Sequence, residues 1–230
     1  MPNHRCFFFS LLLASLPLAG LLAAAPMLED PGIPEEQSVY SSECNNQVQK
    51  ITEVLYSRVV DGKEVYLDTF RSPDLDRYLM VEKATFKVLA THTVRHGAEA
   101  EVETIQLVRE KQPKQRPNEL RVSDYYGLRF LLRGYPFDKP RSLEINQLNG
   151  QDDISMYVKY LATEPMELMG KMVNCIKLEL SFSGVVGAFL PKTQLWYLKA
   201  EPHYLVCYQG ASEFNRKLKC RTKLISYTTR

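Results

Sequence analysis

The amino-acid sequence predicts a mainly β protein, in which about ten antiparallel strands form one sheet and one short helix packs on its concave face. The first observation is a period-two alternation, with Ile176, Leu178 and Leu180 separated by polar residues. This pattern is typical of a strand with one buried face. The second is a pair of turns, Asp61-Gly62 and Asn149-Gly150, each between alternating segments. Both dipeptides favour two-residue hairpin turns.

The amino-terminal segment has the pattern of an export signal, predicted at residues 1–25. Arg5 precedes an uncharged apolar run, residues 7–25, which ends in Ala23-Ala24-Ala25. This pattern predicts cleavage after Ala25 and a periplasmic or otherwise exported protein. Pro26 disfavours that cleavage, and an uncleaved helix over residues 7–25 would reach about 28 Å and act as a membrane anchor. Cys6 precedes the apolar run, so we expect no lipid anchor.

The rest of the chain is predicted to form a single antiparallel β-sheet domain, residues 48–230. Residues 26–47 are acidic and contain proline, and we expect them to be a flexible lead-in. The expected strands span residues 51–60, 63–70, 78–94, 99–110, 142–148 and 154–162, three strands within 164–210, and 217–227.

A helix is expected from Ser123 to Arg133, after a polar prolyl loop at residues 111–118. Ser123 or Asp124 can cap its amino end, and Gly134 followed by Pro136 ends it. Four apolar residues recur at helical spacing and form its packing face: Tyr125, Leu128, Leu131 and Leu132.

The cysteines leave two interpretations open. After the export signal the chain holds Cys44, Cys175, Cys207 and Cys220. Export permits disulfides, and a hairpin between the last two strands would make Cys207 and Cys220 cross-strand neighbours that can bridge. The alternative is buried free thiols, because cysteine is among the most buried residue types.

Several motifs resemble an uncharacterised family of bacterial exported proteins, filed as domain of unknown function 3108. They are Leu128-Arg129 and Leu132-Arg133 at the end of the helix, G-K-x-V-x-C-x-K-x-E-L at 170–180, W-Y at 196–197, P-H-Y-L-V-x-Y at 202–208 and L-I-S-Y at 224–227. That family is similar to the lipoprotein-carrier (LolA) superfamily. The resemblance implies a strongly curved half-barrel that wraps one helix and holds acyl chains in its hollow. It implies no catalytic residue.

No pattern in the chain predicts an enzyme, a metal or a cofactor. His92 and His96 would lie about 13 Å apart along a strand, which is too far to share one metal ion. Ser183 lacks the preceding glycine of a nucleophile elbow, and Asp152-Asp153 is expected at a solvated hairpin end. The formal net charge of +2 gives no basis for nucleic acid as a partner.

Two functions from different classes remain. The first is a binding protein that holds a lipid or another amphipathic molecule, and the ligand-binding residues predicted for it are Tyr125, Leu128, Leu132, Ile176, Leu178, Leu180 and Trp196. A stripe of cations on one face of the last strand could meet its anionic head group: Lys217, Lys219, Arg221 and Lys223. The same cations could instead only prevent aggregation between strands. The second function is a structural or assembly partner in the cell envelope, which docks another protein through a sheet edge or this basic strand.

Overall fold

The computed structural model describes residues 28–97, 102–107, 119–122, 127–140, 142–148, 153–184, 190–211 and 219–230. Within these ranges, thirteen strands form one sheet in the order β6-β5-β4-β3-β2-β1-β13-β12-β11-β10-β9-β8-β7. Their bounds are β1 Glu36–Cys44, β2 Gln47–Val60, β3 Lys63–Arg71, β4 Leu75–Glu82, β5 Lys87–Arg95, β6 Val102–Leu107, β7 Glu119–Val122, β8 Leu143–Leu148, β9 Asp153–Leu168, β10 Lys171–Phe182, β11 Thr193–Leu198, β12 Leu205–Ala211 and β13 Lys219–Thr229. The predicted export signal lies outside the described residues.

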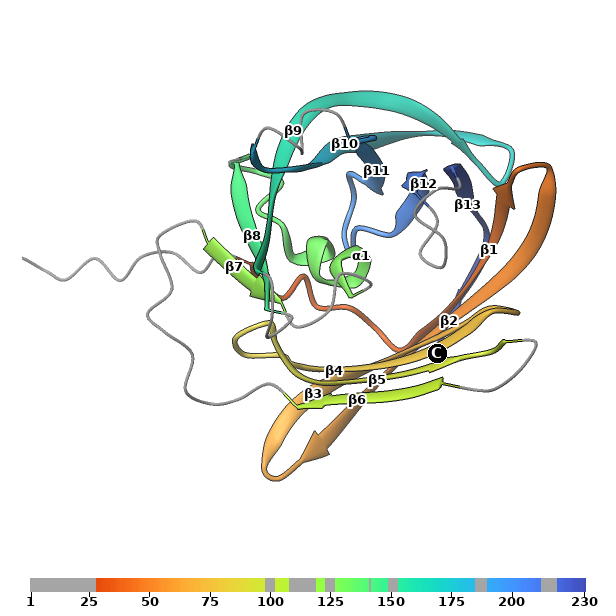
Figure 1. Ribbon diagram of the computed structural model, residues 1–230. Helices are drawn as coiled ribbons and strands as arrows, with labels where there is room; N and C mark the ends of the chain where they lie inside the picture. The colour runs from red at the N-terminus through yellow and green to blue at the C-terminus, as the bar shows by residue number, and fades with distance from the viewer. Residues whose placement is uncertain are drawn as a thin grey trace, which may run out of the picture.

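The sheet consists of two meanders joined at one seam. Strands β1 to β6 form the first meander and β8 to β13 the second, to which β7 adds an edge strand, and β1 pairs with β13 where they meet. Every described pairing is antiparallel except that of β7 with β8. The sheet is strongly curved around an interior (Figure 1). The predicted fold class, a curved antiparallel half-barrel around one helix, is confirmed.

A short helical segment occupies the interior of the curved sheet (Figure 1). It comprises the α-helix α1, Leu128–Leu131, and the 3₁₀ turn η1, Leu132–Gly134. Every residue of both elements is buried. The helix is shorter than predicted: Gly127 is its N-cap, without a capping side chain. The expected caps, Ser123 and Asp124, lie outside the described residues.

The expected flexible lead-in is wrong for the part of it that the structure describes. Residues 36–44 form β1, a central strand between β2 and β13. The preceding residues pack under η1: Leu28 and Ile33 are buried, and the Glu29 amide donates to the Gly134 carbonyl (2.8 Å). The inward positions of β1 include Ser38 and Ser42, so the segment lacks the apolar alternation that would have predicted a strand.

Turn chemistry predicted some strand boundaries and missed others. The Asp61-Gly62 hairpin is confirmed, with both residues at positive φ as a type I′ turn requires. Strands β8 and β9 pair as the Asn149-Gly150 turn predicts, although that turn lies outside the described residues. The single strand expected at 78–94 is wrong, because residues 83–86 turn between β4 and β5. This turn contains neither Gly nor Pro, so it had no strong signal.

Of the two interpretations left open for the cysteines, the Cys207–Cys220 disulfide is wrong. The β12–β13 register places Gly210 opposite Cys220, and Cys207 opposite Lys223. Cys44 lies opposite Cys220 across the seam, with their Cα atoms 4.3 Å apart, and these two cysteines form the disulfide. Cys175 and Cys207 are buried free thiols, the alternative left open for them.

Candidate functional site

The interior around α1 is the candidate site, because it is where the predicted ligand-binding residues gather. Leu128, Leu132, Ile176, Leu178 and Leu180 all belong to one apolar core. Their side chains are at most 5% exposed, so they pack against protein atoms rather than line an open hollow. A ligand can reach this wall only if the side chains that cover it move. Tyr125, which was also predicted to bind the ligand, lies outside the described residues.

Trp196 does not face this interior. It pairs with Lys177 of β10, whereas Ile176 and Leu178 pair with Tyr197 and Leu195. Directly paired residues share a face of the sheet, and successive residues alternate between faces. Trp196 therefore points to the convex face, although it is buried and belongs to the same core cluster, and the Lys177 ammonium sits 4.7 Å from its ring centroid. Its neighbour Tyr197 points inward, and its hydroxyl donates to the backbone carbonyl of Arg129 (2.8 Å).

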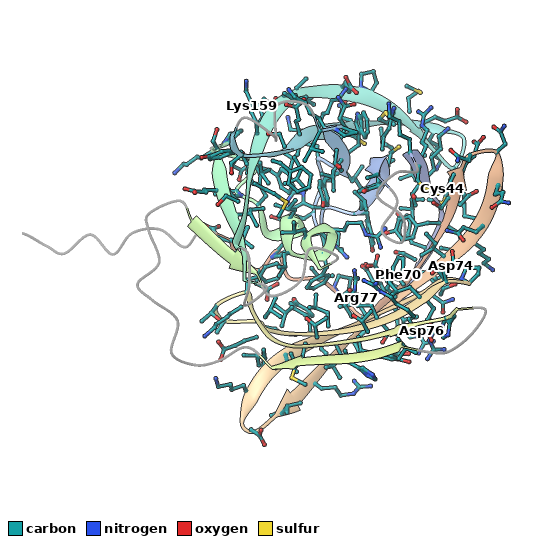
Figure 2. The ribbon with its side chains drawn as sticks, viewed as in Figure 1. Cys44, Phe70, Asp74, Asp76, Arg77 and Lys159 are labelled. Carbon is teal, nitrogen blue, oxygen red and sulfur yellow. A yellow bond between two sulfur atoms is a disulfide. The ribbon has the colours of Figure 1, made fainter. Side chains whose placement is uncertain are left out.

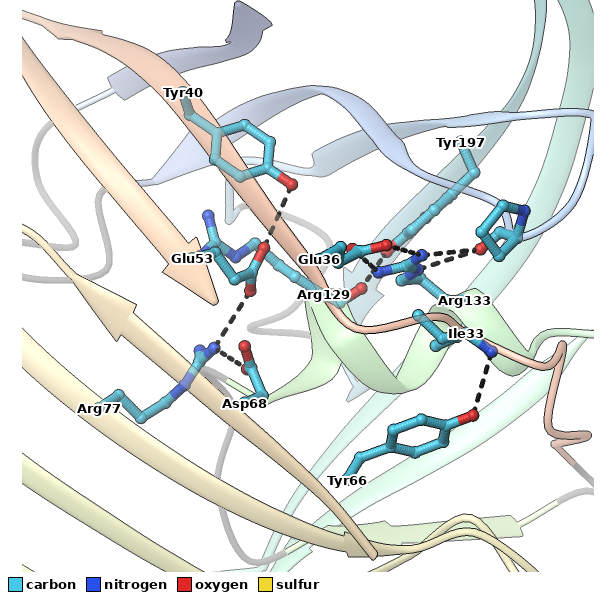
Figure 3. Close-up of polar contacts among 11 residues, drawn as sticks. Ile33, Glu36, Tyr40, Glu53, Tyr66, Asp68, Arg77, Arg129, Arg133 and Tyr197 are labelled. Atoms are coloured by element: carbon cyan, nitrogen blue, oxygen red, sulfur yellow. Dashed lines mark hydrogen bonds and ion pairs between the residues drawn. The ribbon is translucent and has the colours of Figure 1, made fainter. Parts of the chain in front are cut away.

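A buried cluster of charged side chains lies on the concave face below α1 (Figures 2 and 3). The Arg77 guanidinium of β4 donates to Asp68 Oδ2 of β3 (2.7 Å), and Glu53 Oε1 of β2 lies 3.6 Å away. The Tyr40 hydroxyl of β1 donates to the other Glu53 oxygen (3.1 Å). The cluster spans four adjacent strands, and the side chains of Arg77 and Asp68 are completely buried, whereas that of Glu53 keeps a small exposed fraction.

Two arginines connect the helical segment to the wall. Arg133 of η1 donates to both carboxylate oxygens of Glu36 in β1 (2.5 and 3.3 Å) and to the Pro202 carbonyl (3.0 and 3.1 Å). Arg129 of α1 places its guanidinium 4.5 Å from the Phe70 ring centroid. Such charge-assisted and cation–π contacts are strongest where water is excluded. They fix α1 inside the sheet with polar as well as apolar contacts.

Burial dominates the electrostatics of this cluster. Desolvation, with the Glu53 carboxylate close by, raises the pKa of Asp68 to about 7 against the opposing effect of Arg77. Desolvation also raises the pKa of Glu36, although Arg133 opposes it. Both carboxyl groups therefore take up a proton more readily than they would in water. Protonation of either one would weaken its ion pair with the arginine beside it.

The sequence contains a signal for this cluster that is not a catalytic motif. Leu75, Leu79 and Val81 alternate along β4, and Arg77 occupies an inward position of that same alternation. Arg129 and Arg133 are four residues apart, on one side of the helical segment. A charged residue at an apolar position of a periodic pattern predicts a buried partner, but the pattern does not say which residue that partner is.

The three described cations of the predicted basic stripe lie on the convex face. Lys219, Arg221 and Lys223 are exposed and alternate with buried Cys220, Thr222 and Leu224, as predicted. Lys217 lies outside the described residues. Strand β13 is in the middle of the sheet, so these cations do not protect an edge.

Lys219 and Arg221 also line a pocket of about 460 Å³ at the seam, and Lys223 does not. The pocket brings together the β1–β2 turn, the start of β13, the end of β12 and the residues before β11.

The described residues contain no group of three or more His, Cys, Asp or Glu side chains arranged to hold a metal ion. His92 stacks on the Tyr78 ring, and His96 lies 3.6 Å from Asp76, so the two histidines have separate surroundings. In the part of the chain that the structure describes, no helix is both long and apolar enough to cross a membrane.

The fold and site define a class of protein: a curved antiparallel sheet that encloses a short, ionically attached helix. No protein-family model matches the chain, so the resemblance to domain of unknown function 3108 and to lipoprotein carriers stays a prediction. A search of curated proteins likewise gives no match.

Several solved structures are similar to the chain. A β-barrel-like protein of domain of unknown function DUF1849 from Brucella abortus has a TM-score of 0.48 at 8% identity, over 88% of this chain and 99% of that one. The hypothetical lipoprotein YmcC from Escherichia coli has a TM-score of 0.34 at 10% identity, over 86% and 88%. A Bacteroides fragilis protein described as exported, with a YmcC-like fold, has a TM-score of 0.36 at 9% identity, over 88% and 100%. With TM-scores below 0.5, these structures assign neither a family nor a function to this chain.

Proposed function

We propose that this is an exported, non-enzymatic protein of the cell envelope, which binds a lipid or another amphipathic molecule between its curved sheet and α1. The observation that carries the proposal is the composition of the interior. One short helical segment fills it, and apolar side chains surround a few buried charges. An amphipathic ligand needs both surfaces: apolar wall for its chain and charged groups for its polar end.

Ligand entry on this proposal begins with release of the helical segment. Leu128 and Leu132 would leave the wall that includes Leu178, and the ligand's apolar chain would replace their contacts. Arg133 and Glu36 would separate at the same time. Buried ion pairs add little net stability, because desolvation offsets most of their attraction. A helix attached in this way is easier to displace than one held by apolar packing alone.

The first experiment measures bound lipid and uptake of an acyl probe. The protein is purified from membranes under native conditions, its lipids are identified by mass spectrometry, and a fluorescent fatty acid is titrated into delipidated protein. We expect co-purifying lipid and saturable probe binding. A protein that carries no lipid and takes up no probe would overturn the proposal.

Substitutions in the helical segment locate the binding site. Leu128→Asp places a charge in the apolar interior and should abolish probe binding, whereas Val59→Asp, on an exposed position of β2, should leave it unchanged. Arg133→Met loosens the helical segment and should increase probe uptake in a variant that still folds. Because Leu128→Asp can also impair folding, the increase in Arg133→Met is the decisive result. If Arg133→Met takes up the probe no better than the unsubstituted protein and keeps its circular dichroism spectrum, the ligand does not enter by displacing the helix.

The alternative of a structural or assembly partner in the envelope stays a prediction. Docking through β13 would use only its outward side chains, because both of its edges are already paired with β1 and β12.

A further inference from the structure

The pocket at the seam lies apart from the interior site and has a different character. Its lining includes three cations, Lys192, Lys219 and Arg221, and three side-chain amides, Asn45, Asn46 and Gln209. No aromatic side chain belongs to the described lining, so the pocket lacks the stacking surface that neutral sugars or bases use. A volume of about 460 Å³ suits a small polar ligand.

Two of the three cations have no described carboxylate partner, and Arg221 lies beside the Cys207 thiol, which is a weaker acceptor than a phosphate oxygen. The Lys192 ammonium forms an ion pair with Glu179 (2.9 Å). By contrast, no described carboxylate lies within 4 Å of Lys219 or Arg221 in an ion pair. These two side chains project from alternate positions of β13, roughly 6–7 Å apart along the strand. Glu43 is the one described carboxylate of the lining. It lies directly opposite Arg221 on the neighbouring strand β1, and its negative charge would repel a bound anion.

The backbone around the pocket is held in place on three sides. Asn45 and Asn46 form a tight turn with both residues at positive φ, and the Cys44–Cys220 disulfide fixes that turn against β13. Gly210 lets β12 approach Thr193 so closely that an added Cβ would lie 2.5 Å from the threonine hydroxyl. The cations and amides therefore project from a preorganised frame, which lowers the ordering cost of binding.

We propose that this pocket binds a phosphate ester that also carries hydroxyl groups. The Arg221 guanidinium can donate two parallel hydrogen bonds to phosphate oxygens, and Lys219 adds a point charge. The amides of Asn45, Asn46 and Gln209 both donate and accept, which suits hydroxyl groups beside the phosphate. The same chemistry occurs in a soluble sugar phosphate and in the head group of an anionic phospholipid.

The test compares pocket and non-pocket cations of the same strand. Glucose 6-phosphate, inorganic phosphate and glucose are titrated into the full protein by NMR, and vesicles of phosphatidylcholine with 30% phosphatidylglycerol are tested by sedimentation beside pure phosphatidylcholine. Arg221→Ala should weaken binding of glucose 6-phosphate roughly tenfold, the loss of a charge-assisted hydrogen-bond pair. Lys223→Ala, exposed on the same face but outside the pocket, should change it less than about twofold. Glu43→Gln should strengthen binding by about threefold, because it removes the opposing charge.

The two arms distinguish the source of the ligand. Binding of glucose 6-phosphate without vesicle binding supports a soluble ester, and vesicle binding that depends on Arg221 but not on Lys223 supports a lipid head group. Equal losses in the Arg221 and Lys223 variants overturn the pocket, since they indicate diffuse surface charge. The proposal is also overturned if the protein binds neither glucose 6-phosphate nor the vesicles that contain phosphatidylglycerol. Acyl-probe uptake by the interior should be unaffected by Arg221→Ala, so the two proposals fail independently.

Discussion

The two halves of the sheet build their inward faces differently. In the first meander, the inward positions of β1, β3 and β4 include Glu36, Asp68 and Arg77, all buried. In the second meander, the fully buried side chains are apolar or uncharged, as at Met156, Leu178 and Tyr197; no Asp, Glu, Lys or Arg is among them where side-chain burial is described. The first half supplies polar anchors for the helical segment, and the second half supplies apolar wall.

The helical segment bridges these two walls. Phe130 stacks on Phe86 of the first half, while the Arg129 carbonyl accepts from Tyr197 of the second. Arg133 does the same with a single side chain, because it contacts Glu36 in β1 and the Pro202 carbonyl before β12. Substitutions in the first half should therefore change the free energy of unfolding in a way that depends on pH. Substitutions in the second half should change it according to the side-chain volume that they remove.

The seam between the halves gives the largest expected effect. The Cys44–Cys220 disulfide links positions 176 residues apart, and a closed loop of this length is worth roughly 5 kcal/mol in the chain-entropy model. The double substitution Cys44→Ser with Cys220→Ser should lower the free energy of unfolding by up to that amount. Urea denaturation measures it. Cys175→Ser, at a buried free thiol, is the matched control and should cost much less.

The next effect tests the charged wall directly. Arg77→Met leaves Asp68 and Glu53 without the guanidinium that they share, and breaking a buried pair in this way costs about 3–5 kcal/mol. The loss should be smaller at pH 5 than at pH 8, because Asp68 can then be protonated. Leu178→Ala in the apolar wall should cost about 2–5 kcal/mol at both pH values. Equal pH dependence in the two variants would contradict the comparison.

The difference between the walls also explains what the sequence could predict. The apolar wall follows a simple alternation, so Ile176, Leu178 and Leu180 were placed correctly on the inner face. Along β3, Asp68 shares the inner face with Phe70, so the alternation there does not separate inside from outside. Trp196 was misplaced because aromatic character does not show which face a residue occupies; only the strand register shows it. The Cys44–Cys220 pair joins strands β1 and β13, 176 residues apart, and local patterns carry no such long-range information.

A smaller effect is expected beneath the helical segment. A Cβ at Gly134 would lie 2.5 Å from the Glu29 carbonyl and 2.9 Å from the Phe86 ring. Gly134→Ala should therefore push the residues before β1 away from η1 and cost about 1–3 kcal/mol, as overpacking does. Thermal unfolding measures the loss, and protection of the Glu29 amide from hydrogen exchange locates it.

The smallest effect, and the most specific for the charged wall, is on the pH dependence of stability. Burial raises the pKa of Asp68 to about 7, above the roughly 4 expected in the unfolded chain. Between these values the folded state holds a proton that the unfolded state has released. The contribution of this group to stability is therefore present below about pH 4 and is lost as the pH rises through 7.

Asp68→Asn keeps an oxygen for Arg77 and removes the titration. We expect it to change the free energy of unfolding little at pH 5, and to flatten the decline between pH 5 and 8. Glu36, whose pKa is also raised, contributes with the same sign, so some decline should remain. Urea denaturation at four pH values in this range measures both slopes. A slope in Asp68→Asn as steep as that of the unsubstituted protein would show that Asp68 is already ionised in the fold, with Arg77 compensating its burial in full.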